Sequence, residues 1–95
     1  MEFLDHVQQE IESNLRSIKG ILRVGRSPGG HSTVWGKSGR FLGSVRTHPD
    51  TVFIRIRKLD HGEYPSIEDW EAISIYLGDP NFMNAILDVF KAVSK

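Results

Sequence analysis

The stretch TVFIRIRKL, residues 51–59, decides the fold that this sequence predicts. It is rich in β-branched and aromatic residues, which favour strands, and apolar and charged residues alternate through its centre. Successive side chains of a strand point to opposite faces. One face would carry Val52, Ile54 and Ile56, and the other Thr51, Phe53, Arg55 and Arg57. We therefore expect a strand that has one face in the core and a basic second face.

Three shorter segments before it, 21–24, 33–36 and 40–46, also have strand character. Turn-forming residues separate the later segments: KSG at 37–39, and THPD at 47–50, where Pro49 suits a central turn position. Short turns join antiparallel neighbours. Residues 33–59 therefore predict an antiparallel meander, within a sheet of three or four strands.

Segments in which apolar residues have helical spacing flank these strands. Residues 3–22 carry an apolar stripe at intervals of three and four, with Gln8, Gln9, Glu12, Ser13 and Arg16 facing away from it. In IEDWEAISIYL (67–77), helical spacing aligns Ile67, Trp70, Ile73 and Leu77, and Ser66 resembles an N-cap. A last helix begins near Pro80. The predicted class is α+β, with an N-terminal helix, the antiparallel sheet, and two C-terminal helices packed on it.

Length and composition limit the possible classes of protein. The 95 residues suit a single domain, 1–95, with one modest core. The absence of cysteine excludes disulfides and cysteine-ligated zinc. The N-terminal segment lacks the pattern of a signal peptide, and no apolar run approaches the roughly 20 residues of a membrane span. We expect a cytoplasmic protein that does not enter membranes.

Charge is distributed unevenly along the chain. The formal net charge is zero, but residues 16–58 contain ten lysines and arginines and one acid, a net charge of +9. Residues 1–15 carry −4, and residues 59–95 carry −5. Such asymmetry is typical of proteins that meet a polyanion, or that pair electrostatically with another protein or with a second copy of themselves.

The basic region contains a glycine-rich segment, RSPGGHSTVWGKSGR, residues 26–40. Its GKS matches the end of a Walker A loop, but the first glycine of that motif would fall on His31, and a strand-like segment follows where a helix is required. We therefore exclude a nucleotide-hydrolysing loop. Two interpretations stay open: the glycines only form turns, or their backbone amides contact an anion.

Alternation also divides the other predicted strands into two faces. Keeping cations out of the core places Val34, Phe41 and Val45 inside, and Leu42 and Ser44 outside. The outer face suits single-stranded nucleic acid, because bases stack on aromatic rings and arginine binds phosphate. The predicted binding residues are the cations and rings of this outer face together with Arg26: Arg26, Trp35, Lys37, Arg40, Arg46, Phe53, Arg55 and Arg57. A solvated or helix-covered face is the alternative.

The four histidines, His6, His31, His48 and His61, show no metal-ligand spacing, so we predict no metal and no cofactor. His31 and His48 lie in basic segments and could meet beside Arg46 or Lys37. Histidine with a cation cleaves RNA by general acid–base chemistry. A small ribonuclease that needs no metal is therefore one hypothesis.

The leading hypothesis is a small non-enzymatic protein that binds nucleic acid, with RNA or single strands favoured, through the basic sheet face and the glycine-rich segment. The alternative is a protein–protein interaction module, such as a regulator, an inhibitor or a phage-type accessory factor. Its bipolar charge would attract an acidic protein or a second copy of the chain as a homodimer. The leading hypothesis requires that Trp35 and Phe53 face water among the cations.

Overall fold

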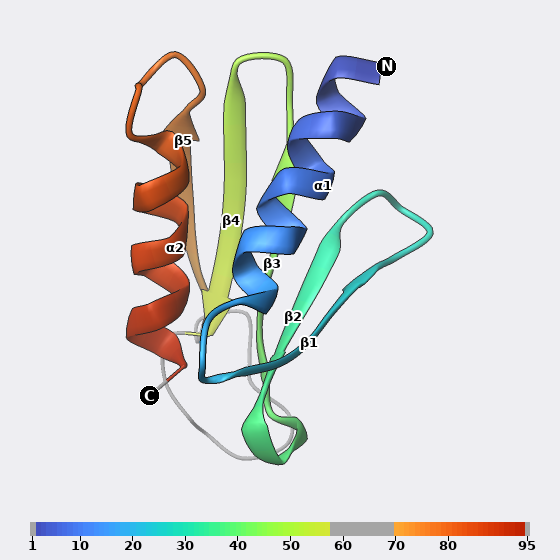
Figure 1. Ribbon diagram of the computed structural model, residues 1–95, viewed down its shortest axis with the longest axis vertical. Coiled ribbons are helices and arrows are strands. Elements are labelled where there is room, and N and C mark those ends of the chain that lie inside the picture. Colours follow the sequence, from blue (N-terminus) through green and yellow to red (C-terminus); the bar gives the residue numbers. More distant parts are fainter. Residues whose placement is uncertain (1, 58–69, 95) are drawn as a thin grey trace.

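A computed structural model of the chain describes residues 2–57 and 70–94 (Figure 1). Helix α1 (Glu2–Arg16) comes first and helix α2 (Phe82–Val93) comes last. Between them lie β1 (Ile21–Arg26), β2 (Ser32–Gly36), the short 3₁₀ helix η1 (Lys37–Gly39), β3 (Phe41–Thr47), β4 (Thr51–Arg57) and β5 (Trp70–Tyr76). The predicted α+β class is confirmed.

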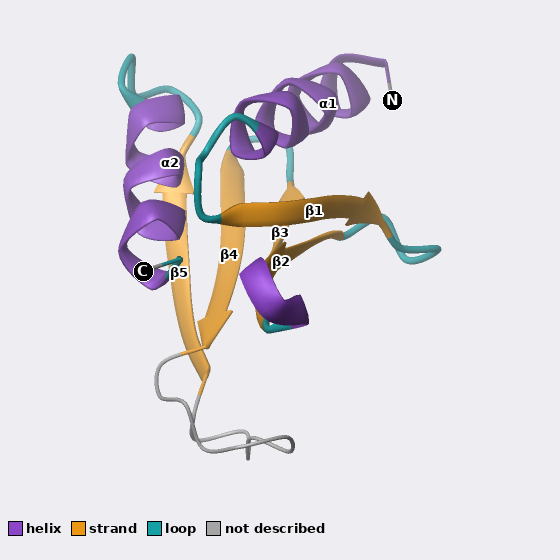
Figure 2. Ribbon diagram, turned by 60° about the horizontal axis from the view of Figure 1, so that its bottom comes forward, coloured by secondary structure: helices purple, strands orange, loops and turns teal. Residues whose placement is uncertain are grey.

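The five strands form one antiparallel sheet in the order β1-β2-β3-β4-β5, so each strand pairs with its neighbours in the chain. Both helices lie on one face: α1 contacts β1 and β3, and α2 contacts β4 and β5 (Figure 1). The sheet is strongly twisted, and β1 runs across the direction of β4 and β5 (Figure 2). The predicted meander is confirmed as far as residue 57; residues 58–59 lie outside the described residues.

The prediction for the C-terminal half is wrong in one element. The expected helix 67–77 contains strand β5, so the sheet has five strands, and in the described part of the chain one helix follows it. Ile73 pairs with Ile54 and Ile75 with Val52, which places both isoleucines on the helix-facing side. Ile73 and Leu77 are also four residues apart, and that spacing is typical of one face of a helix, which explains the wrong prediction. Residues 67–69 and the proposed Ser66 cap lie outside the described residues.

The first helix ends earlier than predicted, at Arg16 rather than near residue 22. Its last turn tightens: Ser17 and Ile18 donate backbone hydrogen bonds to residues three positions earlier. Ile18 and Ile21 remain buried, because the connection folds onto the core before β1 begins. Apolar residues at helical spacing therefore continue past the residue at which the helix ends.

The core lies between the helices and the sheet. Val7, Ile11 and Leu15 of the predicted stripe are buried, as are Ile86 and Phe90 of α2. They pack on the helix-facing side chains of the sheet, which include Val24, Val34, Leu42, Val45, Val52, Ile54 and Ile56. Each such side chain contributes about 1.5–3 kcal/mol when it leaves water. Burial on this one side of the sheet is therefore the main stabilising contribution.

A β-bulge corrects the predicted faces of β3. Val34 pairs with Gly43 and Trp35 with Phe41, so β3 has one extra residue, Leu42, at this point. Leu42 is consequently buried, at 2% exposure, and Phe41 turns to the opposite face, where its ring contacts Trp35. The prediction assigned Phe41 to the core and Leu42 to the outside, because strict alternation contains no bulge.

Close approach of β3 and β4 requires glycine next to this bulge. A Cβ on Gly43 would lie 2.3 Å from the carbonyl oxygen of Arg55, a backbone atom that cannot rotate away. We expect Gly43→Ala to lower the free energy of unfolding by about 2 kcal/mol or more, measured by urea denaturation. Gly25→Ala is the matched control, since its new Cβ would be 4.0 Å from the nearest atom, Thr33 Oγ1. A Gly43→Ala protein as stable as the Gly25→Ala protein would contradict this geometry.

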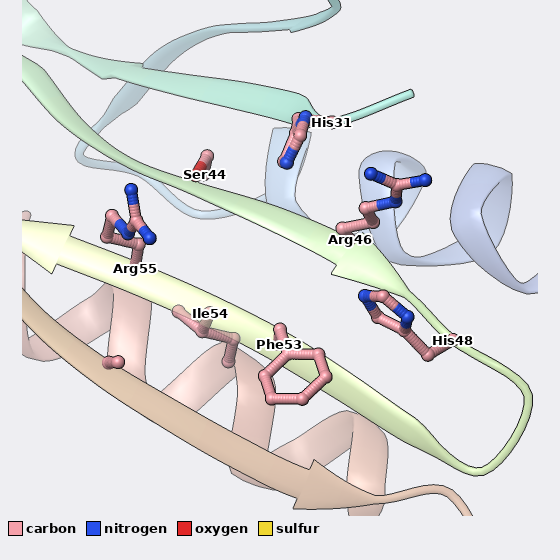
Figure 3. A pocket seen from close by; sticks show the side chains of 8 residues that line it. His31, Ser44, Arg46, His48, Phe53, Ile54 and Arg55 are labelled. Carbon is pink, nitrogen blue, oxygen red and sulfur yellow. The ribbon is translucent and has the colours of Figure 1, made fainter. Parts of the chain in front are cut away.

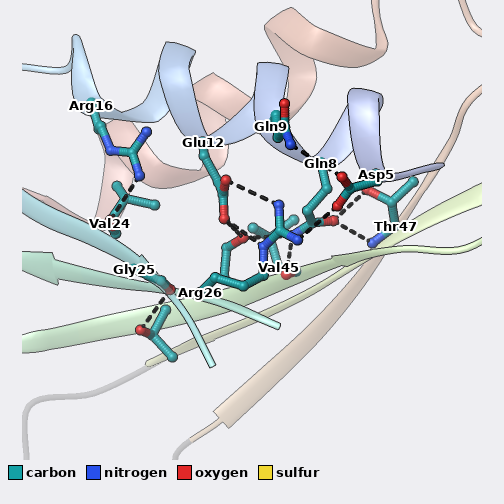
Figure 4. Close-up of polar contacts among 12 residues, drawn as sticks. Asp5, Gln8, Gln9, Glu12, Arg16, Val24, Gly25, Arg26, Val45 and Thr47 are labelled. Carbon is teal, nitrogen blue, oxygen red and sulfur yellow. Dashed lines mark hydrogen bonds and ion pairs between the residues drawn. The ribbon is translucent and has the colours of Figure 1, made fainter. Parts of the chain in front are cut away.

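Polar side chains are buried between α1 and the sheet (Figure 4). Gln8 and Glu12, predicted to face away from the core, are only 4% and 6% exposed. The Gln8 amide donates to Ser32 Oγ at 2.6 Å and to the Val45 carbonyl at 2.9 Å, and its oxygen accepts from the Thr47 N–H at 2.8 Å. Ser32 in turn donates to Glu12 at 2.5 Å. Both polar ends of the buried amide are therefore satisfied.

Arg26 completes this buried network. Its guanidinium donates two hydrogen bonds to Glu12, at 2.8 and 3.1 Å, and one to Asp5 at 2.9 Å. Burial raises the pKa of Glu12, but the hydrogen bonds from Arg26 and Ser32 and the charges of Arg26 and Arg16 outweigh it, so this pKa lies below its ordinary value of 4.5. The hydrogen bonds that Arg26 donates to Glu12 and Asp5 raise the pKa of Arg26.

The lowered pKa of Glu12 makes its contribution to stability depend on pH. The carboxylate stabilises the fold fully above pH 4.5, and that stabilisation is lost as the pH falls through the folded-state pKa. We expect Glu12→Gln to lower the free energy of unfolding at neutral pH by about 1–3 kcal/mol. The difference from the wild type should shrink below pH 4.5. Urea denaturation across this range measures both effects.

Glu10→Gln provides the control, because Glu10 is exposed on the same helix and contacts only His6, at 3.6 Å, among the described ion pairs. It should change stability by about 0.5 kcal/mol or less. A difference between wild type and Glu12→Gln that stays constant from neutral to acidic pH would contradict the role assigned to this carboxylate.

Candidate nucleic-acid interface

The face of the sheet turned away from both helices carries a distinct set of side chains. We call it the open face; its residues include Arg23, Thr33, Trp35, Phe41, Ser44, Arg46, Phe53, Arg55 and Tyr76. No helix of the described residues packs on this side (Figure 1). Register pairs Arg46 with Phe53 and Ser44 with Arg55, so these four side chains stand in two rows across β3 and β4.

The centre of the open face is hollowed (Figure 3). The hollow has a volume of about 210 Å³ and is lined by His31, Ser44, Arg46, His48, Phe53, Ile54, Arg55 and Ala72. His31 reaches it from the turn before β2, and Arg46 and His48 from β3 and the turn after it (Figure 3). Its lining contains two arginines and two histidines and no acidic residue. The local charge therefore favours an anionic ligand.

Two hairpin turns place the histidines at this hollow. In the first, the Ser27 N–H donates to the His31 carbonyl at 2.7 Å, and Gly30 has φ +88°, a left-handed value that favours glycine. In the second, the His48 N–H donates to the Thr51 carbonyl at 2.7 Å and leaves a two-residue loop. Successive strands of a meander alternate in direction, so the turn after β1 and the turn after β3 lie at the same end of the sheet (Figure 1).

The glycine-rich segment 26–40 is not one loop: it contains strand β2 with a separate turn on either side. Gly30 lies in the first turn, and Gly39, with φ +76°, ends η1. The N–H groups of Gly30 and Gly36 donate to the Ser27 and Arg40 carbonyls, at 3.0 and 2.8 Å. These two amides are therefore used in hydrogen bonds within the turns. Contact of the segment's amides with an anion stays a prediction.

Arg46 and Arg55 differ from the arginines that stabilise the fold. Both are exposed, and within the described residues neither forms an ion pair or a side-chain hydrogen bond. Phe53, which is 48% exposed, stands between them on the same face. The ring of His48 meets that of Phe53 edge to face, with centroids 4.7 Å apart and planes at 88°. Charge and an exposed ring are thus combined within one hollow.

A second aromatic group lies further along the open face. The Arg23 guanidinium is 5.1 Å from the centre of the Trp35 ring, which in turn contacts Phe41 with ring centroids 4.9 Å apart. Leu22, Arg23, Trp35 and Gly39 line a shallow hollow there, of about 370 Å³. Cation–π contact of this kind holds Trp35 half-buried, so less of its face than that of Phe53 is available for stacking.

Most of the predicted binding residues lie on the open face. Arg46, Phe53 and Arg55 line the central hollow. Trp35 shares their face, and Arg57 occupies the next open-face position along β4 and is half-buried. Alternation within strands sufficed to group these five residues, since the bulge leaves their faces unchanged.

Arg26 and Arg40 do not belong to this group. Arg26 reaches the opposite side of the sheet and is paired with Glu12 and Asp5. Arg40 donates to the carbonyl oxygen of Val93, at 3.2 Å, near the end of α2. Lys37 is exposed in η1, outside the central hollow. The prediction that Arg40 shares the outer face is therefore wrong, because the chain leaves the plane of the sheet at η1.

Sequence analysis missed several members of the open face. Tyr76 was placed in a helix, although the alternating segment WEAISIY carried a strand signal. His31 and His48 are absent from the predicted set of binding residues, since no local pattern shows that two turns meet. Among the described residues, no three His, Asp or Glu side chains are grouped to hold a metal ion. No described helix is long and apolar enough to cross a membrane.

Comparison of the chain with protein-family models, with curated proteins and with solved structures gave no match. The function is therefore inferred from the geometry and chemistry of the open face.

Proposed function

We propose that this protein binds single-stranded nucleic acid, with RNA favoured, through the central hollow of the open face. The observation that carries the proposal is the position of Phe53, an exposed ring flanked by the exposed arginines Arg46 and Arg55. A base can stack on the ring while the guanidinium groups contact the phosphates beside it. A double helix offers no such access to the face of a base, and this favours single strands.

The burial pattern also supports a binding surface. An antiparallel sheet can leave one face in water, but such a face usually carries polar residues. This one exposes Phe53 and Tyr76, and it half-exposes Trp35 and Phe41. Aromatic residues among cations are more expected at a ligand-binding surface than on an inert solvated one.

Salt dependence tests the electrostatic part of the proposal. Binding of a short single-stranded RNA should weaken as salt rises, with a slope of log K against log salt of about −0.7 for each neutralised phosphate. Replacing Arg46 and Arg55 by glutamine should therefore reduce the magnitude of that slope by about 1.4. Fluorescence anisotropy at several salt concentrations measures the slope.

Lys19→Gln with Lys91→Gln is the matched control, because it removes the same charge outside the open face and should leave the slope nearly unchanged. Equal slopes for both double variants would contradict a role for the open face. A wild-type protein that binds no single strand at low salt, but elutes as a dimer or with an acidic protein, would favour the interaction module instead.

Phe53→Leu tests the stacking part. Loss of one stacked base costs about 1–3 kcal/mol, so Kd should rise by about 5- to 150-fold while the salt slope stays the same. Phe3→Leu is the control, because Phe3 is an exposed aromatic residue on α1, 66% exposed against 48% for Phe53, and lies away from the open face. Tight binding by Phe53→Leu would show that the ring carries no base.

A further inference from the structure

The two histidines of the hollow lie on either side of Arg46. Ser32 pairs with Val45, so His31, one residue before Ser32, comes next to Arg46 on the adjacent strand. His48 stands two residues beyond Arg46 in the chain. Neighbouring strands are about 4.8 Å apart, and alternate residues of one strand about 6.7 Å. Both imidazoles therefore lie within reach of one group held by Arg46, and both line the same hollow (Figure 3).

Phe53 places a bound nucleotide relative to these histidines. The edge-to-face contact holds the His48 ring 4.7 Å from the Phe53 ring, centre to centre. Because His48 and Phe53 line the same hollow, a nucleotide whose base stacks on Phe53 would have its sugar and phosphate in the hollow that His48 also lines. On the other side of Arg46, His31 is exposed, with its backbone fixed by the turn. Two imidazoles and the Arg46 guanidinium therefore line the same hollow as the exposed ring.

We propose that the protein cleaves single-stranded RNA at this hollow, with His31 and His48 as the acid–base pair and Arg46 and Arg55 as the phosphate ligands. This inference rests on the proposed function, because the strand must first bind there. The substrate of the reaction is RNA. Single-stranded DNA lacks the 2′-hydroxyl, so the protein binds it but does not cut it.

The reaction needs no co-reactant. One imidazole takes the proton of the 2′-hydroxyl as that oxygen attacks the neighbouring phosphorus, and the bond from phosphorus to the 5′-oxygen breaks. The other imidazole gives its proton to the departing 5′-oxygen. The products are a 2′,3′-cyclic phosphate and a 5′-hydroxyl. Charge that develops on the phosphate oxygens is stabilised by the guanidinium groups of Arg46 and Arg55.

Two RNA probes of the same sequence separate cleavage from binding. One is a short fluorescent RNA, and the other carries a 2′-O-methyl group at every ribose, so it cannot form the cyclic product. With EDTA present, we expect the first to be cut into fragments that end in a 2′,3′-cyclic phosphate and a 5′-hydroxyl. The second should be bound but remain intact. Mass spectrometry identifies the fragment ends, and anisotropy measures binding.

Three variants test the assigned residues. His31→Gln and His48→Gln should each slow cleavage by about 100-fold or more, the usual contribution of an acid or a base, while binding of the 2′-O-methyl strand changes much less. His6→Gln is the control, because His6 is exposed on α1 and lies outside the hollow. It should cut RNA at the wild-type rate. Urea denaturation of each variant verifies that it folds.

Three results would overturn the cleavage reaction or the binding function. Wild-type protein that binds both probes and cuts neither overturns the cleavage reaction and leaves the proposed binding function intact. Failure to bind either probe overturns the binding function itself. Cleavage that persists at the wild-type rate in both His31→Gln and His48→Gln, with these variants folded, also overturns the reaction at this hollow.

Discussion

Gln8 and Glu12 reach from α1 into the space between that helix and the sheet, where their hydrogen bonds fix the position of the helix. Apolar contacts alone would allow α1 to slide, because they have no preferred direction. A buried amide and a buried carboxylate need specific partners, and leaving either unpaired costs more than a weak contact gains. Ser32 and Arg26 supply those partners only when α1 lies across β1, β2 and β3 as it does here.

Contacts with both helical elements explain why the basic residues of the middle of the chain do not form one surface. Arg26 is drawn to the helix side by two carboxylates, and Arg40 is directed to the end of α2. Arg46 and Arg55 project from the opposite face and, within the described residues, have no ionic partner. The acidic N-terminal segment therefore neutralises part of the +9 region, and two of its other cations, Arg46 and Arg55, stand beside Phe53.

The meander topology adds the histidines to this charge. Because the turns after β1 and after β3 lie at one end of the sheet, residues from two distant turns line one hollow. The bulge at Leu42 contributes in a different way, since it sends Phe41 to the open face and supports Trp35 there. A small sheet thus combines rings, arginines and imidazoles on one side while its other side holds the core.

The sequence by itself determined the strand 51–57, the antiparallel order of its neighbours, the stripe of α1 and the grouping of Arg46, Phe53 and Arg55. These features follow from periods of two and of three to four residues, which each segment carries locally. Residues 70–76 carried both alternation and helical spacing, and only the tertiary structure decided between a strand and a helix. It also decided that Leu42 faces inward and that Arg26 pairs with Glu12. Each of those outcomes depends on a partner from another part of the chain: β4 for β5, β2 for the bulge, and Glu12 for Arg26. Local periodicity contains no information about such partners, so pairing energies between distant segments overrode it.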